Sequence, residues 1–337
     1  NLRNPNAVRF AGLPLPDSRP TLRSEEPVSG DPCPKVRSMG PRIVQHVKKT
    51  CFGLLDRMSP GLIERSEIGK YAMASVRPLA STASSDRFSA GAVLSTPGLD
   101  FNLTDQEALV REIGLQSGLF QSIRSDSRIN TQRHAQADRI RNGFYPTPDA
   151  ETYAAMIAMR RPQRIVEIGG GFSTLIARRV IDALGLTTEL VVIDPEPRTD
   201  VSAAASKVIH ERVELAGLSE ADFPATSILF IDSSHILRTG GDLPILYGHL
   251  VPSLPPGVHV HVHDIYLPFD YSELGTDLWW TEQYVLQALL AHSPRYRIDL
   301  ALRWMTAMSP DLMSEVFGTI VVTEPAHGGG SLWFTTV

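Results

Sequence analysis

The segment from Arg164 to Ile181 constrains the fold of this chain more than any other. It opens with residues 164–168, whose composition predicts a buried strand, and passes through three consecutive glycines into a segment of helical composition. Glycine tolerates positive φ angles and has no Cβ atom, so this turn lets backbone N–H groups approach a ligand at the N-terminus of a helix. The segment therefore predicts a strand–turn–helix unit that binds a ligand at its turn.

The spacing of the glycines argues against a dinucleotide fingerprint, because the third glycine of that motif would fall at Thr174. An acidic residue, Glu167, instead stands two positions before the first glycine. A second one, Asp194, ends the next apolar segment, 189–193. A carboxylate at the end of a second strand can accept hydrogen bonds from both hydroxyls of a ribose. The alternative is an ordinary βα turn followed by an acidic helix cap.

From residue 150 onward the pattern predicts an α/β fold. We expect strands at 164–168, 189–193, 207–211, 227–232, 258–263, 295–303 and 331–337, and helices near 150–160, 173–184, 199–206, 241–250 and 279–292. Strands that alternate with helices form a doubly wound, mostly parallel sheet with helices on both faces. Ligands of such sheets bind at the carboxyl ends of the strands.

The N-terminal part of the chain has a different composition. Residues 1–40 contain seven prolines and little apolar periodicity, which predicts an extended arm or linker. Residues 41–140 show helical patterning, and a capping box between Thr104 and Glu107 predicts a helix that runs to about Ile123. We therefore expect an arm (1–40), a helical extension (41–140) and an α/β domain (141–337).

Charge and composition exclude several classes of protein. The net charge of −5 argues against nucleic acid as the main partner, and it is divided into +5 for residues 1–70 and −10 for the rest. A basic N-terminal helix could dock on the acidic domain or build a homo-oligomer, or it could be solvated. No apolar run approaches the ~20 residues of a membrane span, and no signal peptide is visible. With Cys33 and Cys51 as its two cysteines, the chain fits a reducing cytoplasm.

Residues that can carry chemistry follow the fourth and fifth predicted strands, at the same edge of the sheet as the glycine turn. Asp232, His263 and Asp264 could offer one imidazole and two carboxylates to a divalent ion. His235, one helical turn after Asp232, would then be free to act as a general base. Alternatively, Asp232 could contact an organic cofactor or cap a helix, and His235 could orient a loop. Asp264 is the strongest catalytic candidate, because a carboxylate at the end of a central strand has little structural use.

Three histidines alternate along the fifth predicted strand, so His259, His261 and His263 should face the same side of the sheet. We expect His259 to be a buried, hydrogen-bonded core residue. The pattern leaves the role of His261 open. Trp333 is also expected in the core.

Several motifs resemble a known family. Glu167-x-Gly169-x-Gly171, followed by Asp194, resembles the first motifs of class I S-adenosylmethionine (SAM) methyltransferases. The phrases FIDSSH at 230–235, HVHDI at 261–265 and WTEQY at 280–284 are similar to a bacterial branch of metal-dependent O-methyltransferases that act on macrolide sugars. The resemblance covers about residues 140–337. It implies a seven-stranded Rossmann-like methyltransferase sheet whose last strand is antiparallel.

The same resemblance implies roles for individual residues. SAM would be held by Tyr145, Glu167, Gly169, Gly170, Gly171, Ser173 and Asp194. A divalent metal such as Mg²⁺ would be held by Asp232, His263 and Asp264, although the family has Glu-Asp where this chain has His263-Asp264. His235 would be the base. The implied reaction is methyl transfer to a hydroxyl of a small molecule, such as a sugar or another specialised metabolite.

Two segments are expected to line the acceptor site. The loop 266–280 is long and aromatic, with Tyr266, Phe269, Tyr271, Trp279 and Trp280, and the segment 142–148 brings Tyr145 beside SAM. These aromatic residues could instead pack against the N-terminal helices. Two other functions stay open from the residues alone. One is a metal-dependent oxygenase or hydrolase on the same fold, and the other is a non-catalytic scaffold subunit with a basic arm.

Overall fold

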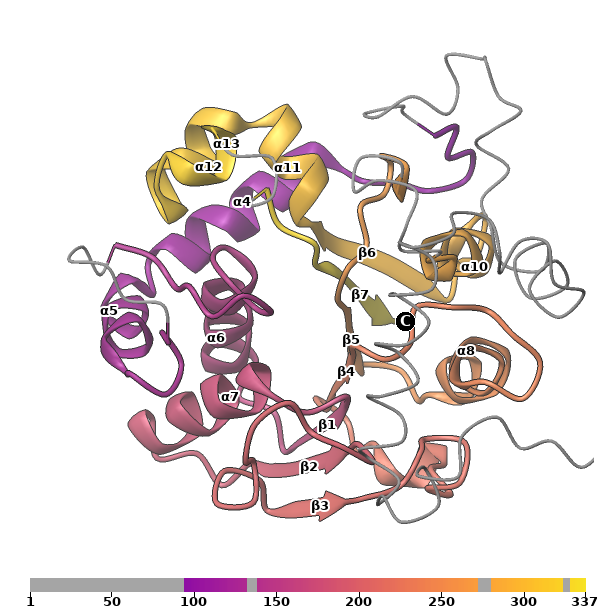
Figure 1. Ribbon diagram of the computed structural model, residues 1–337. Coiled ribbons are helices and arrows are strands. Elements are labelled where there is room, and N and C mark those ends of the chain that lie inside the picture. The colour runs from indigo at the N-terminus through magenta and orange to yellow at the C-terminus, as the bar shows by residue number, and fades with distance from the viewer. Residues whose placement is uncertain (1–93, 132–137, 272–279, 324–327) are drawn as a thin grey trace, which may run out of the picture. The chain divides into compact units, whose positions relative to one another are not determined.

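The computed structural model describes residues 94–131, 138–271, 280–323 and 328–337 (Figure 1). The predicted arm at 1–40 lies outside the described residues. So do the helical extension before residue 94, the N-terminal helices through which an oligomer was expected, and Trp279. None of the helices in the described ranges has the length and apolar character that a membrane span requires.

Seven strands form one sheet in the order β3-β2-β1-β4-β5-β7-β6. Their bounds are β1 Arg164–Ile168, β2 Glu189–Ile193, β3 Lys207–Ile209, β4 Ile228–Ile231, β5 His259–Val262, β6 Tyr296–Ala301 and β7 Leu332–Thr336. Strands β1 to β5 pair in parallel, whereas β7 is antiparallel to both β5 and β6. The sheet is therefore mixed, and the seven predicted strands with an antiparallel last one are confirmed.

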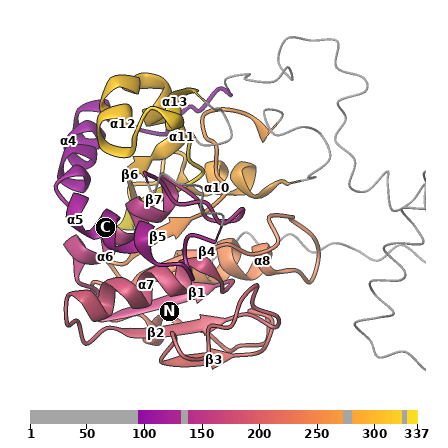
Figure 2. The ribbon, with the colours of Figure 1, turned by 60° about the vertical axis from the view of Figure 1, so that its left-hand side comes forward.

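Helices cover both faces of the sheet (Figures 1 and 2). One face packs against α4 (Leu103–Gly114), α5 (Ser117–Ser125), α6 (Asp149–Arg160) and α7 (Phe172–Ala183). The other packs against α8 (Asp242–Ile245), the π-helix η5 (Leu246–Leu250), α9 (Val251–Ser253) and α10 (Glu282–Leu290). Fully buried side chains of β4 alternate between these two layers, with Phe230 on the first side and Leu229 on the second. A 3₁₀ helix, η4 (Glu220–Asp222), precedes β4.

The helix predicted at 199–206 is wrong, because the chain makes only one turn there. The N–H groups of Ala204 and Ala205 both donate to the carbonyl of Val201. Ser206 then pairs with Leu190 through its backbone N–H and its hydroxyl, which draws the chain into β3 at once. The buried positions Val201 and Ala204 have helical spacing, and this spacing made a longer helix plausible from the sequence.

The helix predicted from the capping box is also corrected. It is divided into α4 and α5, and α4 begins at Leu103 with Asn102 as its cap, whose side chain accepts from the N–H of Asp105. Glu107 does not reach back to Thr104. It accepts a hydrogen bond of 2.5 Å from the hydroxyl of Ser309, which lies far along the chain.

Three helices between β6 and β7 were not predicted: α11 (Leu302–Met308), α12 (Pro310–Phe317) and α13 (Ile320–Thr323). The strand expected to reach residue 303 ends at Ala301, and α11 begins at the next residue, Leu302. Phe317 of α12 stacks on Phe120 of α5, with ring centroids 6.3 Å apart. The inserted helices thus extend the layer that α4 and α5 form.

Candidate functional site

The turn between β1 and α7 has the geometry that its glycines predict. Gly169 has φ of +95°, and a Cβ atom there would lie 2.1 Å from the carbonyl oxygen of Asp232. The N–H of Gly170 donates to Oδ2 of Asp194 at 2.8 Å. The close backbone approach at Gly169 joins the ends of β1 and β4, and the bond from Gly170 joins the ends of β1 and β2.

Glu167 lies beneath this turn and is fully buried. Its two oxygens accept hydrogen bonds from the hydroxyls of Tyr153 (2.9 Å) and Thr174 (2.5 Å), and the Thr174 oxygen accepts the N–H of Gly171 (3.1 Å). Burial raises the pKa of Glu167 to about 7, although these hydrogen bonds act in the opposite direction. Glu167 therefore holds the turn in place and does not line the cavity above it.

A cavity of about 620 Å³ lies over the turn. Six of the seven residues predicted to contact an organic cofactor line it: Tyr145, Gly169, Gly170, Gly171, Ser173 and Asp194. Apolar residues also line it, including Ile193, Pro195 and Val213. Phe144 forms another part of the wall, where it stacks on Phe172 (centroids 6.1 Å apart) beneath the guanidinium of Arg198 (4.6 Å). The cavity combines apolar surfaces with a few polar and acidic groups, as small-molecule sites do.

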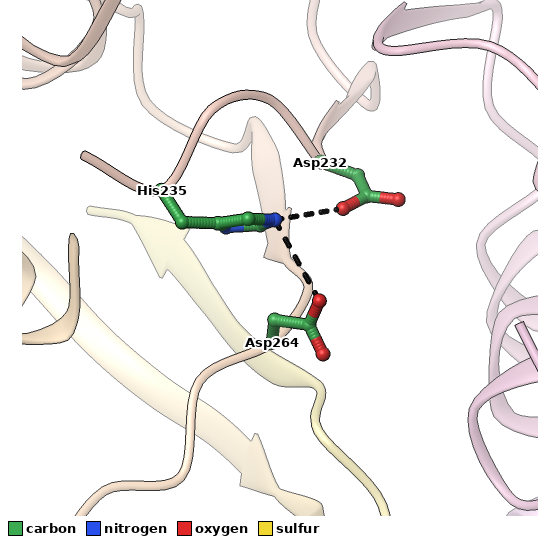
Figure 3. A group of neighbouring side chains, drawn as sticks. All are labelled: Asp232, His235 and Asp264. Carbon is green, nitrogen blue, oxygen red and sulfur yellow. Dashed lines mark ion pairs between the residues drawn. The ribbon is translucent and has the colours of Figure 1, made fainter. Parts of the chain in front are cut away.

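Asp232 connects this cavity to a cluster of acidic and imidazole side chains. It lines the cavity, and its Oδ1 lies 3.2 Å from Nε2 of His235 (Figure 3). Oδ2 of Asp264 lies 3.6 Å from the same nitrogen. One ligand atom from each of Asp232, His235 and Asp264 lies within 4.8 Å of the others, so these residues could hold a metal ion.

His263, the predicted metal ligand, contacts the same two carboxylates from another side. Its Nδ1 lies 3.6 Å from Oδ1 of Asp232 and 3.7 Å from Oδ2 of Asp264. This nitrogen is buried and has no hydrogen-bond partner. The His263 ring packs on Tyr145, with centroids 4.8 Å apart. The four residues predicted to carry metal and base chemistry are thus brought together, but the group with metal-ligand spacing contains His235 in place of His263.

The cluster is strongly charged. Burial acts to raise the pKa of Asp232, but the neighbouring imidazoles of His235 and His263 hold it well below its usual range. Burial acts to lower the pKa of His263, but Asp264 and Asp232 raise it to about 9. The pKa of His235 lies well above its usual value because Asp232 and Glu282 outweigh burial. These carboxylates stabilise positive charge between them.

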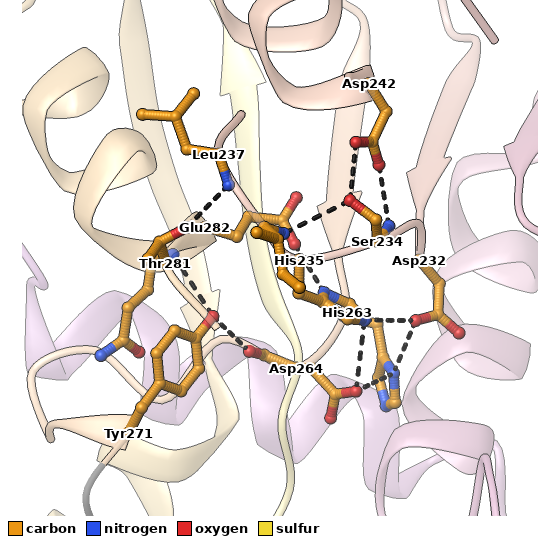
Figure 4. Close-up of polar contacts among 12 residues, drawn as sticks. Asp232, Ser234, His235, Leu237, Asp242, His263, Asp264, Tyr271, Thr281 and Glu282 are labelled. Carbon is orange, nitrogen blue, oxygen red and sulfur yellow. Dashed lines mark hydrogen bonds and ion pairs between the residues drawn. The ribbon is translucent and has the colours of Figure 1, made fainter. Parts of the chain in front are cut away.

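Glu282, for which no role was predicted, is a fully buried part of this network (Figure 4). Its Oε2 lies 2.6 Å from Nδ1 of His235, and its Oε1 accepts from the hydroxyl of Tyr247 at 2.5 Å. Ser234, next to His235, is held by Asp242 through both its N–H and its hydroxyl. Glu282 stands inside the quoted motif WTEQY, but no local pattern pairs it with a residue 47 positions earlier.

Two residues of the cluster have an unusual backbone conformation. His235 and Asp264 have φ of +60° and +59°, in the left-handed region that non-glycine residues seldom adopt. Residues held in this way are concentrated at functional sites. The loops after β4 and β5 therefore aim these two side chains at each other with a local conformational cost.

The other two histidines of β5 are structural. His259 contacts the hydroxyl of Thr335 at 2.8 Å, which confirms the predicted hydrogen-bonded histidine, although the residue is only partly buried. His261 is fully buried, stacks on Trp333 with centroids 4.1 Å apart, and contacts the hydroxyl of Ser331 at 2.8 Å. Trp333 is fully buried, so its predicted place in the core is confirmed.

The predicted acceptor segments reach the same cluster. The hydroxyl of Tyr271 donates to the carbonyl of Asp264 (2.9 Å), and that of Tyr266 lies 3.4 Å from its carboxylate. Trp280 packs on His235, with centroids 4.6 Å apart. The residues between Tyr271 and Trp280 lie outside the part of the chain that the structure describes.

No protein-family profile and no curated protein matches this sequence. Among solved structures, the chain is similar to an O-methyltransferase from Bacillus cereus in complex with SAH, at 12% identity and a TM-score of 0.33, covering 69% of this chain and 90% of that one. It is similar to the SAH-bound Podospora anserina methyltransferase PaMTH1, at 14% identity and a TM-score of 0.35, covering 81% and 97%. A cmcI-N160 structure with SAH matches at 16% identity and a TM-score of 0.26, covering 34% of this chain and 59% of that one.

Proposed function

We propose that this chain is a SAM-dependent methyltransferase that transfers a methyl group to a hydroxyl of a small molecule. The observation that carries the proposal is the position of Asp232. This residue lines the cavity above the glycine turn and also belongs to the cluster of His235 and Asp264. A cofactor in the cavity would therefore lie beside a group of side chains that can hold an ion and accept a proton.

The parts of SAM match different parts of the cavity wall. Ile193, Pro195 and Val213 offer apolar contacts for an adenine ring. Asp194 accepts one N–H on each carboxylate oxygen, from Gly170 and Glu196. Each oxygen therefore keeps a lone pair for a ribose hydroxyl. Asp232 provides negative charge for the sulfonium, whose positive charge distinguishes SAM from neutral nucleosides.

The cluster also fits a divalent metal. Two carboxylates and an imidazole form a ligand set with the required spacing, and the buried Nδ1 of His263 is directed at the same carboxylates without a hydrogen bond. A metal bound there would lower the pKa of a coordinated acceptor hydroxyl. Asp232 and Asp264 would hold it, together with an imidazole.

The reaction would form an oxygen–methyl bond and break the sulfur–methyl bond of SAM, which leaves a neutral thioether. The proton of the acceptor hydroxyl would pass to an imidazole of the cluster, which a metal ion bound between the two carboxylates would keep neutral. Tyr266, Tyr271 and Trp280 surround this position with aromatic surface. Such a wall suits a sugar or another hydroxylated metabolite.

Calorimetric titration of SAM into ligand-free protein tests the cofactor. We expect micromolar binding by the wild type and at least tenfold weaker binding by Asp194→Ala, because a lost pair of charge-assisted hydrogen bonds costs at least about 1.4 kcal/mol. Asp200→Ala is the matched control, since Asp200 is an exposed acid in the same loop and does not line the cavity. Absence of binding by folded, ligand-free wild type would refute the proposal.

Transfer of labelled methyl groups from SAM to a panel of hydroxylated acceptors, with and without a chelator, tests the reaction. Methylation at carbon or nitrogen alone would contradict a hydroxyl acceptor. Metal analysis of the same sample addresses the alternative chemistry. Tightly held iron or zinc in protein that binds no SAM would instead favour the oxygenase or hydrolase.

A further inference from the structure

His235 is held by the start of α10 through its backbone. The N–H groups of Thr281 and Glu282 both donate to the carbonyl oxygen of His235, at 2.8 and 3.1 Å. The N–H of Leu237 in turn donates to the hydroxyl of Thr281 at 2.7 Å. These three bonds fix the loop after β4 against the helix. They maintain the left-handed conformation of His235, which its side chain alone would not favour.

The imidazole ring is oriented by the same helix. Nδ1 of His235 lies 2.6 Å from Glu282, and Glu282 is fully buried and fixed at its other oxygen by Tyr247. A carboxylate at this distance accepts the proton of Nδ1. The lone pair of a neutral His235 is therefore on Nε2, which faces Asp232 and Asp264 (Figure 4).

The distances from His235 to the two carboxylates are those of ligands that share one ion. Bonds of 2.0–2.2 Å place neighbouring ligand atoms about 3–3.6 Å apart. Nε2 of His235 is 3.2 and 3.6 Å from the two carboxylate oxygens, whereas Nδ1 of His263 is 3.6 and 3.7 Å from them. A feature that distinguishes His235 is the carboxylate on its other nitrogen. Metal-ligating histidines almost always donate their second N–H to such a partner.

We propose that Glu282 is a positioning residue that makes Nε2 of His235 a ligand of a divalent metal held also by Asp232 and Asp264. The inference rests on the metal site of the proposed function and deepens it. A nitrogen ligand shifts the preference from Mg²⁺ toward ions such as Co²⁺ and Zn²⁺. The assignment also exchanges the roles expected from the sequence, where His263 was the ligand and His235 the base.

The test compares two histidine variants of the full chain, each free of metal and SAM. We expect Co²⁺ to bind at least tenfold more tightly than Mg²⁺ to the wild type. Cu²⁺ bound to the wild type should show nitrogen splitting in its electron paramagnetic resonance spectrum. The splitting should be lost in His235→Ala and kept in His263→Ala. Loss in His263→Ala alone, or in neither variant, would overturn the proposal, as would equal affinity for Co²⁺ and Mg²⁺.

The role of Glu282 is tested with Glu282→Gln, which keeps the shape of the side chain. We expect Co²⁺ to bind 10–100-fold more weakly, since loss of an outer carboxylate has about that effect. Tyr247→Phe is the matched control, because it removes the other hydrogen bond of Glu282 and keeps the contact with His235. Wild-type affinity in Glu282→Gln, or an equal loss in both variants, would contradict the positioning role.

Circular dichroism of each variant distinguishes the loss of a metal ligand from a failure of the variant to fold. The histidine pair still decides the ligand if Glu282→Gln does not fold. No SAM is present in these titrations. A failure of SAM binding in the separate calorimetric experiment would therefore refute the proposed function, but the metal-binding result could still be interpreted.

Discussion

At Gly169 the backbone of one strand end passes so close to another that no side chain can stand between them. We predict that Gly169→Ala lowers the free energy of unfolding by about 2 kcal/mol or more, because of its positive φ and the contact with the Asp232 carbonyl. Gly171→Ala is the control in the same turn. Its φ is 174°, and its Cβ would find a neighbour only at 3.7 Å. Urea unfolding of both variants measures the difference, and equal losses would contradict this account of the turn.

A buried carboxylate with a raised pKa links stability to pH. The folded-state pKa of Glu167, about 7, lies above its ordinary value of 4.5, so the folded protein binds more protons between these values. The stabilisation of the folded state that comes from protonated Glu167 is fully present below pH 4.5, and it is lost as the pH rises through 7. From the size of the shift, the contribution of Glu167 should fall by on the order of 3 kcal/mol over this interval.

Glu167→Gln should remove this contribution. We expect the difference in unfolding free energy between wild type and variant to change across pH 4.5–7, in the direction of a wild type that weakens as pH rises. Glu220→Gln, which removes an exposed carboxylate, should leave the pH profile unchanged. Parallel profiles for wild type and Glu167→Gln would show that the carboxyl does not titrate in this range.

Single residues could be predicted where their signal is local. The glycine turn, Asp194, and the residues after β4 and β5 stand at strand ends in the sequence, so their meeting at one edge follows from parallel pairing. The position of Glu167 beneath the turn depends on hydroxyls from α6 and α7. The contact of Glu282 with His235 depends on how α10 docks. Neither of these two features can be recognised from the spacing of residues in the sequence.

Strands were more predictable from the sequence than helices. Each strand is a short apolar run, and β1 and β2 begin and end where expected. The helices α11 to α13 were missed because the run that opens α11 continues the strand-like composition of β6, so the sequence does not mark the boundary at Ala301. The predicted helix at 199–206 failed for the opposite reason, because tertiary pairing of Ser206 overrides local propensity.

The unpredicted helices should contribute strongly to stability. Phe317 is 1% exposed and packs on Phe120, so Phe317→Ala is expected to cost about 3–5 kcal/mol. Met308, in the same insertion, is 52% exposed, and Met308→Ala should change stability by less than about 0.5 kcal/mol. Chemical denaturation gives both values. A small effect at Phe317 would show that α12 is not part of the cooperative unit.

The order of the strands in the sheet determines where the site lies. Strand order reverses between β1 and β4, so the chain leaves these neighbouring strands toward opposite faces of the sheet (Figure 2). A crevice forms at the carboxyl ends of strands at such a reversal. The glycine turn follows β1, and Asp232 follows β4, on the two sides of this crevice. The positions of the cavity and of the His/Asp cluster therefore follow from the sheet topology, which the pattern of strands in the sequence predicts.

Because the cavity is lined by segments that follow β1, β2 and β4, a ligand there should stabilise the whole domain. SAM at 100 times its dissociation constant adds about 2.7 kcal/mol to the free energy of unfolding. For a domain of this size, that corresponds to a rise of about 5–10 °C in Tm. At the same SAM concentration, Asp194→Ala should show at most about half of this rise, because tenfold weaker binding leaves about 1.4 kcal/mol of stabilisation, and Asp200→Ala should show the full rise. Thermal scans across a SAM concentration series measure the shift. A full rise in Asp194→Ala would place the bound SAM outside the cavity that this carboxylate lines.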